Sequence, residues 1–533
     1  MPMLTHPFHL SLKRNLVAAA WLAMAGAAIA QTVAVPDWQA ALTTPLTSIV
    51  TDRNALALDA GGNAYLASTG PFSCTLNRYS AAGVLQWTRT AAVPAVAGLS
   101  KVSQCSVVTD PNGNAIVVGD ALAAKYGADG TLLWFQEVSA TATSSVGVLV
   151  AIDASGDVVV ARPNSAGSLE LTRRSGTTGA ALWTSPVLDT SGLPVALRRG
   201  ALRLNGAQVV VSSGHDAQLV IASFAMANGA LVGRQTLNVP GTTSDLAIGP
   251  SGEVAVVGSI SYWLWGNGYN VYLFDSSLAT TLFAKSLPDG KAALRVAMDA
   301  QRNVYVTGLA VDPNSTPVTS PFGTVAPGPW SDWLTVKLDP TGTLLWTARM
   351  GQRTDTNEAP QLMRLAADGG VIVAGQGGLP GSATPATQSA AVKYAAANGA
   401  ALWSAMSNAA LDAVDLKEAA DSSLFVVGAS PMGLVQHYAG LAKPSAVSFA
   451  SSSITGGKRV LGTVRLSNNA GAVVKLASSK PSVASVPASV TIPAGATSAS
   501  FSITTYRVRS TTAVSISASA NGGITSATLN IKR

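Results

Sequence analysis

Two stretches decide the fold of this chain, Asp299-Ala-Gln-Arg-Asn-Val-Tyr-Val-Thr-Gly308 and Lys337-Leu-Asp-Pro-Thr-Gly-Thr-Leu-Leu-Trp346. In each, a turn rich in Asp, Asn or Gly adjoins a short run typical of a β-strand. Similar strand patterns cover residues 294–299 and 333–338. Together these segments predict a four-stranded antiparallel sheet made of two hairpins.

The end of this unit recurs along the chain as a glycine followed four residues later by a tryptophan. The pairs are Gly83/Trp87, Gly130/Trp134, Gly179/Trp183, Gly342/Trp346 and Gly399/Trp403. They close units of about 50 residues. A repeat of that length indicates one small sheet copied many times, with each copy covering the apolar face of its neighbour.

The N-terminal segment supplies one further copy of the anchor. Gly233 and Phe283 take the tryptophan position in two degenerate repeats, and the last repeat lacks a fourth strand. Trp38 lies 49 residues before Trp87, so we expect its segment to complete the last sheet. Closure removes exposed sheet edges. Anchors at 38, 87, 134, 183, 233, 283, 346 and 403 therefore predict an all-β, eight-bladed β-propeller over residues 31–443, closed by an N-terminal strand.

Residues 1–30 have the features of a secretory signal peptide. Lys13 and Arg14 precede an apolar run from 16 to 27, and Ala28-Ile29-Ala30 is a small-residue cleavage site. The alternative, a membrane anchor, is disfavoured because the apolar run is short for a bilayer. No later run is apolar enough to span a membrane. We expect a mature protein that is secreted, periplasmic or on the cell surface.

The formal charge of +7 is distributed unevenly along the chain. Residues 444–533 hold nine basic and no acidic residues, whereas residues 31–443 hold 23 basic and 27 acidic residues. Such a field favours an anionic partner, and outside the cytoplasm that partner is an acidic polysaccharide or cell-surface component rather than nucleic acid. The alternative is a solubilising surface that attracts the acidic body. The candidate contact residues are Lys458, Arg459, Arg465, Lys475, Lys480, Arg507 and Arg509.

Residues 444–533 also change pattern. Six or seven short stretches of nearly alternating apolar and polar residues are separated by turn signals such as Gly456-Gly457 and Pro493-Ala-Gly495. This predicts a two-sheet β-sandwich. Residues 480–486 and 490–501 resemble bacterial Ig-like modules of secreted and surface proteins, and the stretch has no cysteine pair.

The two stretches quoted at the outset resemble the exported bacterial propeller repeats of the SBBP and PQQ-like type. The resemblance covers about three quarters of the chain and implies that the repeated tryptophans dock neighbouring blades. It implies no particular activity, because such propellers range from enzymes to scaffolds.

Aromatic residues gather in two predicted loops on one face of neighbouring blades. They are Tyr262, Trp263, Trp265, Tyr269, Phe322 and Trp330. An exposed aromatic patch would suit sugar rings. The alternative is that these rings pack the insertions against each other. Trp333 begins the following strand and suits the core.

The two cysteines, Cys74 and Cys105, fall on the same face of adjacent predicted blades. In an exported protein an even count favours a disulfide, and two buried free thiols are the alternative. The Asp-rich turns between first and second strands do not have the spacing of a calcium loop, so we interpret them as structural turns.

The chain lacks the signatures of an enzyme. It has no adjacent cysteine pair, no haem-attachment motif, no Gly-x-Ser-x-Gly elbow and no zinc-ligand cluster, and His215-Asp216 lacks a placed nucleophile. We therefore expect no catalytic residues, no bound metal, no cofactor and a monomer. The expected function is a secreted or surface-associated binding and scaffold protein. The alternatives are an adhesion or spacer component of the cell surface, and a PQQ-type quinoprotein oxidoreductase.

Overall fold

The computed structural model describes 25 segments of the chain. They are residues 33–34, 38–41, 54–70, 72–94, 105–119, 121–137, 148–163, 168–186, 200–214, 218–237, 243–259, 269–287, 290–311, 318–319, 325–326, 331–351, 358–377, 389–406, 412–419, 423–429, 434–438, 442–467, 472–493, 496–520 and 523–533. The predicted signal peptide lies outside them. Within these segments the protein is all-β, and no helix in them could cross a membrane.

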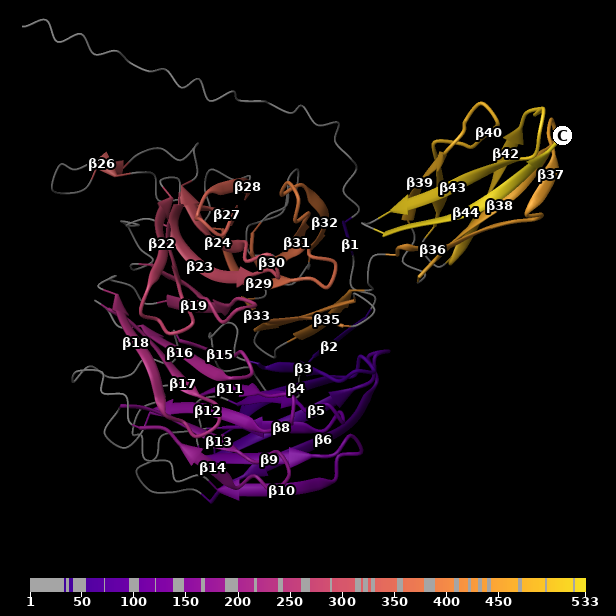
Figure 1. Cartoon of the computed structure of the whole chain (residues 1–533). Coiled ribbons are helices and arrows are strands. Elements are labelled where there is room, and N and C mark those ends of the chain that lie inside the picture. The colour runs from indigo at the N-terminus through magenta and orange to yellow at the C-terminus, as the bar shows by residue number, and fades with distance from the viewer. Residues whose placement is uncertain are drawn as a thin grey trace, which may run out of the picture.

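Four-stranded antiparallel sheets follow one another along the chain, which is the arrangement of a β-propeller (Figure 1). The first three sheets contain β3 (Leu56–Leu58), β4 (Ala64–Gly70), β5 (Ser73–Tyr79) and β6 (Leu85–Ala92); β7 (Ser106–Thr109), β8 (Ala115–Val118), β9 (Leu122–Tyr126) and β10 (Leu132–Glu137); and β11 (Leu149–Ile152), β12 (Val158–Pro163), β13 (Leu169–Arg174) and β14 (Ala181–Thr184). The fourth and fifth contain β15 (Ala201–Leu204), β16 (Gln208–Gly214), β17 (Leu219–Ala225) and β18 (Leu231–Leu237); and β19 (Thr243–Ile248), β20 (Val254–Ser259), β21 (Tyr269–Phe274) and β22 (Thr281–Leu287).

The sixth sheet has the strands that its sequence predicts, each extended by a few residues. It contains β23 (Gly290–Met298), β24 (Val304–Val311), β27 (Ser331–Leu338) and β28 (Leu344–Met350), with a small hairpin of β25 (Val318–Thr319) and β26 (Val325–Ala326) inserted after β24. The seventh contains β29 (Ala359–Leu365), β30 (Val371–Gln376), β31 (Ser389–Tyr394) and β32 (Ala401–Met406). After it come β33 (Asp412–Glu418), β34 (Leu424–Ala429) and β35 (Leu434–Tyr438).

The N-terminal segment completes this last sheet, as the sequence predicts. β2 (Trp38–Ala41) pairs antiparallel with β35, and Trp38 lies opposite His437. One core cluster joins Leu66 and Tyr79 of the first sheet to Phe425 and Val427 of the last, with Trp38 packed against it. A pairing that the sequence did not indicate comes just before: β1 (Val33–Ala34) runs parallel to β32 of the seventh sheet.

Five of the anchor tryptophans, at positions 38, 87, 134, 183 and 346, rest on the turn glycine of the next sheet. A β-carbon on Gly83 would lie 2.5 Å from Cδ2 of Trp38, and one on Gly399 would lie 2.6 Å from Cε3 of Trp346. These glycines also have positive φ, +79° at Gly83 and +70° at Gly399. Glycine is therefore required twice, by the backbone conformation and by the close approach of the indole.

A buried cation reinforces the same contact. Lys125 lies opposite Trp134 on the neighbouring strand of the second sheet. It pairs at 2.7 Å with Asp110, which lies in the turn between the first two strands of that sheet, called the first turn below. Its Nζ donates to the Gly176 carbonyl of the next sheet at 2.7 Å, and the Trp134 indole N–H donates to the same carbonyl at 3.1 Å. Arg173 with Trp183, and Lys337 with Trp346, share a carbonyl acceptor in the same way. Turn aspartate, cation and indole thus act as one docking unit.

The fourth and fifth sheets lack all three members of this unit. Gly233 and Phe283 stand where the indole belongs, and Ser223 and Leu273 lie opposite them in place of the cation. Where the fourth sheet packs on the fifth, the large and the small residue change places. The small Gly233 stands at the anchor position, and the buried Leu278, with φ of +63°, stands at the turn position that is glycine in other sheets.

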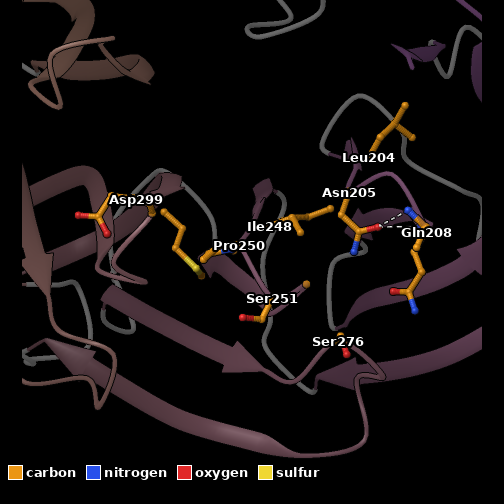
Figure 2. Close-up of a pocket in the computed structure, with 13 residues that line it drawn as sticks. Leu204, Asn205, Gln208, Ile248, Pro250, Ser251, Ser276 and Asp299 are labelled. Atoms are coloured by element: carbon orange, nitrogen blue, oxygen red, sulfur yellow. Dashed lines mark hydrogen bonds between the residues drawn. The ribbon is translucent and has the colours of Figure 1, made fainter. Parts of the chain in front are cut away.

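A hollow of about 650 Å³ lies where the docking unit is missing (Figure 2). Its walls are the first turns of the fourth, fifth and sixth sheets and one residue of the β21–β22 turn. The lining residues are Leu204, Asn205, Ala207, Gln208, Ile248, Gly249, Pro250, Ser251, Gly252, Ser276, Met298, Asp299 and Ala300. The turn at Asn205 closes with a bond from Asn205 N to Gln208 O, one residue shorter than the Asp59-to-Asn63 turn.

The C-terminal residues form two further sheets. One contains β36 (Pro444–Phe449), β38 (Arg459–Leu466), β42 (Ser498–Thr505) and β40 (Ala484–Ser485). The other contains β37 (Ser453–Thr455), β44 (Gly523–Lys532), β43 (Thr512–Ala520), β39 (Ala472–Ser478) and β41 (Ser489–Ile492). Both sheets contribute to one core that includes Val464, Phe501, Ile516 and Leu529. Ala442 belongs to this core, and Lys443 lies 3.5 Å from Asp368 of the seventh sheet.

Candidate functional site

Cations in the propeller sheets and in the C-terminal unit have different surroundings. In the described part of the propeller many are neutralised locally, as Arg78 is by Asp59 and Lys393 by Asp368. The nine basic residues of 444–533 are all exposed, and no described ion pair includes any of them. Because residues 444–533 contain no carboxylate side chain, no negative side chain within this unit offsets its positive electrostatic potential.

Five of the seven predicted contact residues come together at one end of the C-terminal unit. Gly456 N donates to the Lys532 carbonyl at 2.9 Å, and Gly457 N donates to the Thr505 carbonyl at 3.2 Å. The turn that carries Lys458 and Arg459 therefore lies between the C-terminus and the end of β42. We call the following set the basic tip: Lys458, Arg459, Lys480, Arg507, Arg509, Lys532 and Arg533.

Two further contacts bring Arg507 and Lys480 to this end, and Arg509 follows two residues after Arg507. A β-carbon on Gly457 would lie 3.6 Å from Cγ of Arg507, which places the Arg507 side chain against that turn. Tyr506 N donates to the Val483 carbonyl at 2.9 Å, and Ala484 N donates to the Lys480 carbonyl at 3.0 Å, so the Lys480 turn packs beside β42. In Figure 1 the C-terminus lies at the end of this unit that points away from the propeller sheets.

Arg465 and Lys475 do not belong to the basic tip. Arg465 lies six residues along β38 from Arg459, and Ser445 Oγ donates to its carbonyl near the start of the unit. Lys475 lies on the other sheet, opposite Ser519. The sequence pattern marks both as exposed cations but does not show that they are remote from the tip.

Lys532, Arg533 and Tyr506 were not among the predicted contact residues. Lys532 and Arg533 reach the tip because β44 ends beside the turn at Gly456. Tyr506, 46% exposed, precedes Arg507 and lies with its hydroxyl 3.4 Å from Ser485 Oγ. An aromatic residue next to an Arg-x-Arg pair in a predicted loop is the signal that could have found it.

The predicted aromatic patch includes one residue that the structure assigns elsewhere. Tyr269 belongs to β21 and is fully buried, and its hydroxyl donates to the Leu334 carbonyl at 2.6 Å. It is a core residue joining the fifth and sixth sheets, so its assignment to a ligand platform was wrong. Tyr262, Trp263, Trp265, Phe322 and Trp330 lie outside the described residues, as do His215 and Asp216. Trp333 is fully buried, as a core residue should be.

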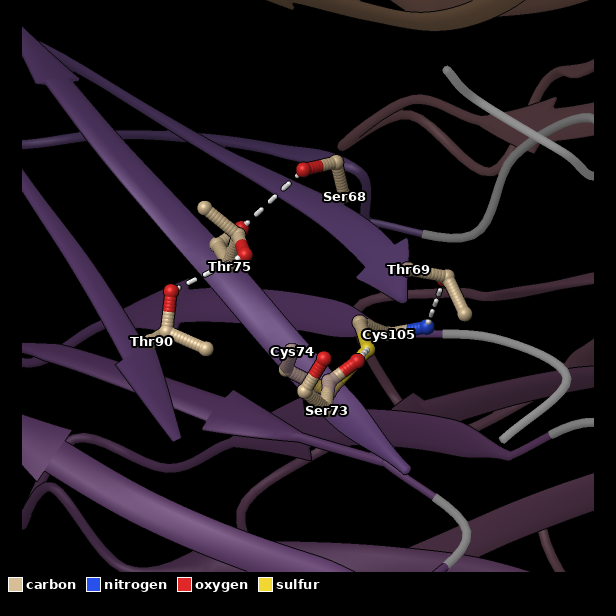
Figure 3. The surroundings of a disulfide bond; sticks show 7 residues. All are labelled: Ser68, Thr69, Ser73, Cys74, Thr75, Thr90 and Cys105. Carbon is tan, nitrogen blue, oxygen red and sulfur yellow. Dashed lines mark hydrogen bonds between the residues drawn. A yellow bond between two sulfur atoms is a disulfide. The ribbon is translucent and has the colours of Figure 1, made fainter. Parts of the chain in front are cut away.

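Cys74 and Cys105 are joined by a disulfide that connects the first and second sheets (Figure 3). Cys74 lies in β5, and Cys105 directly precedes β7. Both are buried, with Cα atoms 5.7 Å apart. Thr69 Oγ1 accepts a hydrogen bond from Cys105 N at 3.0 Å, which fixes the entry to the second sheet.

The turn aspartates are occupied by the protein's own donors. Asp299 Oδ1 accepts from the backbone N–H groups of Gln301 and Asn303, and its Oδ2 accepts from the Asn303 amide and the Tyr305 hydroxyl. Burial alone would raise the pKa of Asp299, but these hydrogen bonds outweigh it and hold the pKa below its usual value. Among the described residues no group of three His, Cys, Asp or Glu could hold a metal ion.

Solved structures similar to this chain are propellers of different kinds. The Dos1 propeller is 13% identical, with a TM-score of 0.49 over 76% of this chain and 95% of its own. A europium-containing methanol dehydrogenase is 10% identical, with a TM-score of 0.44 over 76% and 93%. The WD40 domain of Toxoplasma gondii coronin is 8% identical, with a TM-score of 0.43 over 77% and 88%. At these identities the likeness concerns the fold alone.

No protein-family model matches the chain. No curated protein matches it either.

Proposed function

We propose that this protein is a secreted or surface-associated, non-catalytic binding protein whose basic tip engages an acidic polysaccharide. In this proposal residues 1–30 are a cleaved signal peptide, residues 31–443 form an eight-bladed propeller closed by β2, and residues 444–533 form an Ig-like sandwich. The propeller is the rigid body that presents the sandwich and its own loops. The observation that carries the proposal is the basic tip.

The composition of the tip supports a polyanion. The seven cations of the basic tip lie on a unit that has no carboxylate side chain. Three of them, Lys458, Arg459 and Lys480, are in or beside short turns. Such clustered, exposed charges attract a chain of regularly spaced anionic groups more than a single small anion, because each cation adds its own contact. Arg507 and Arg509 can each form two parallel hydrogen bonds with a carboxylate.

The experiment compares two double variants that remove the same charge. Arg507→Gln/Arg509→Gln removes two cations at the tip, and Arg465→Gln/Lys475→Gln removes two away from it. Binding of the mature chain to immobilised alginate, a linear polyuronate, is measured by surface plasmon resonance at several salt concentrations, with neutral dextran as the blank.

The two variants should differ strongly. At about 1 kcal/mol for each cation at an anionic surface, the tip variant should lose roughly 30-fold in affinity. Arg465 is about 20 Å along its strand from Arg459, more than two Debye lengths of ~8 Å at physiological salt. The control variant should therefore lose about twofold or less. Equal losses would reduce the proposal to a general charge effect, and tighter binding to anionic lipid vesicles than to alginate would replace the polysaccharide by a membrane.

A further inference from the structure

We propose that the hollow between the first turns of the fourth, fifth and sixth sheets binds a neutral sugar residue. This site is independent of the basic tip and of its polyanion. Its volume of about 650 Å³ falls within the range of about 300–1,000 Å³ that is usual for small-molecule sites.

The hollow exists because the repeat loses its docking unit here. In the second sheet the Lys125 side chain spans from β9 to Asp110 and fills the space under the turn. In the fourth and fifth sheets Ser223 and Leu273 replace that cation, and Asn205 and Gly249 replace the aspartate. The long cation is therefore absent from both sheets. Under the first turn of the fifth sheet the carboxylate comes instead from Glu253, which accepts from Ser251 N at 3.1 Å and pairs with Arg302 of the sixth sheet at 2.7 Å. The space between the turns stays open where the cation would lie.

Two side-chain amides offer donors at this hollow. Asn205 Oδ1 accepts from Ala207 N at 3.2 Å and from Gln208 N at 2.7 Å, and Gln208 Oε1 accepts from Ser223 Oγ at 3.0 Å. The two backbone donors assign the oxygen of Asn205, so its NH₂ group is left to serve a ligand. Gln208 bonds Ser223 through its oxygen and leaves its own NH₂ group as well. In Figure 2 Asn205 and Gln208 lie on the right, Ile248 and Ser251 in the middle, and Asp299 on the left.

The remaining lining fits a neutral, hydroxylated ring. Ser251 and Ser276 each bring a hydroxyl that can donate or accept, and Ile248, Pro250 and Met298 supply apolar surface for C–H groups. Asp299 is the one ionised side chain among the lining residues, and its oxygens are already bonded within its own turn. An anion would find no charged partner in this lining, and a cation would find no carboxylate with spare acceptors. A sugar uses donors, acceptors and apolar contact together.

The decisive variant is Ser251→Trp, which fills the hollow from an exposed turn position. Its matched control is Ser155→Trp, at the same turn position in the third sheet, where Ser155 is also exposed. A third variant, Gln208→Glu, keeps the acceptor for Ser223 Oγ and exchanges the amide donor for an oxygen. Thermal unfolding of each variant confirms that the sheets remain folded.

Binding is measured on the mature chain by saturation-transfer NMR with four neutral probes: maltotriose, lactose, mannobiose and chitobiose. We expect saturable binding of at least one probe, lost in Ser251→Trp and retained in Ser155→Trp. Removal of one hydrogen bond in Gln208→Glu should weaken it about fivefold. The binding should not change with salt, unlike that of the basic tip. Absence of saturable binding to all four probes, or equal binding by both tryptophan variants, would overturn the proposal.

Discussion

Substitution of Gly83 by alanine tests how the N-terminal strand is held. The new methyl group would meet the Trp38 indole at 2.5 Å and would also sit on a backbone with φ of +79°. Gly206 provides the matched control, because its φ is +86° and nothing lies within 4 Å of an added methyl. Both variants carry the same backbone penalty, of about 1–2 kcal/mol. Only Gly83→Ala adds overpacking, which costs about 1–3 kcal/mol.

The expected difference between the two variants is therefore about 2 kcal/mol in the free energy of unfolding, a factor of roughly 30 in the equilibrium constant. Urea unfolding of residues 31–533 followed by circular dichroism measures it. In a Trp38→Ala background the difference should vanish, because the indole that the methyl meets is gone. If Gly83→Ala and Gly206→Ala destabilise equally in the native background, Trp38 does not dock on the first sheet.

Three further outcomes follow from buried groups. The variant Cys74→Ser/Cys105→Ser should lose about 3–4 kcal/mol of stability, since the bridge closes a 31-residue separation; thermal unfolding with and without reductant checks this, and an unchanged midpoint in both would contradict it. Burial alone would raise the pKa of Asp110, but hydrogen bonds from Lys125 and Asn114 lower it below its usual value. Its ionisation therefore stabilises the fold above about pH 4 and ceases to do so as pH falls below that, so acid unfolding of Asp110→Asn should be less steep with pH. Tyr269→Phe should cost about 0.5–1.5 kcal/mol, because the Leu334 carbonyl loses the Tyr269 donor but keeps the bond from Thr307 Oγ1, and it should leave sugar binding unchanged in the NMR titration.

Much of the propeller was predictable because its signals are local. The turn at Asp299 and the anchor at Trp346 lie within short stretches whose chemistry specifies hairpins, and the structure has those hairpins. The pairing of Trp38 with the last sheet was also predictable, because a repeat with a missing strand implies where that strand must come from. The parallel contact of β1 with β32 had no such signal, since two residues carry no period.

The candidate sites were predictable only in part. Composition showed that residues 444–533 are basic, but not that Arg507 packs against the turn before Lys458 while Arg465 lies apart. Tyr269 was placed with the loop aromatics because it follows them in sequence, and the alternation of a strand buried it instead. Asn205 and Gly249 carry no local signal of a site, and only the packing of their sheets shows the hollow between their turns.

The amino-acid order by itself determined the all-β class, the length of the repeating sheet and the junction near Pro444, because turn chemistry and strand alternation act over a few residues. Only the tertiary structure decided that a small anchor, Gly233, packs on a large turn residue, Leu278. The same holds for the carbonyl of the next sheet that a cation and an indole share, and for which cations form the basic tip. Those relations join residues some 20 to 75 positions apart. Their distances are set by how sheets pack on each other, which no local pattern encodes.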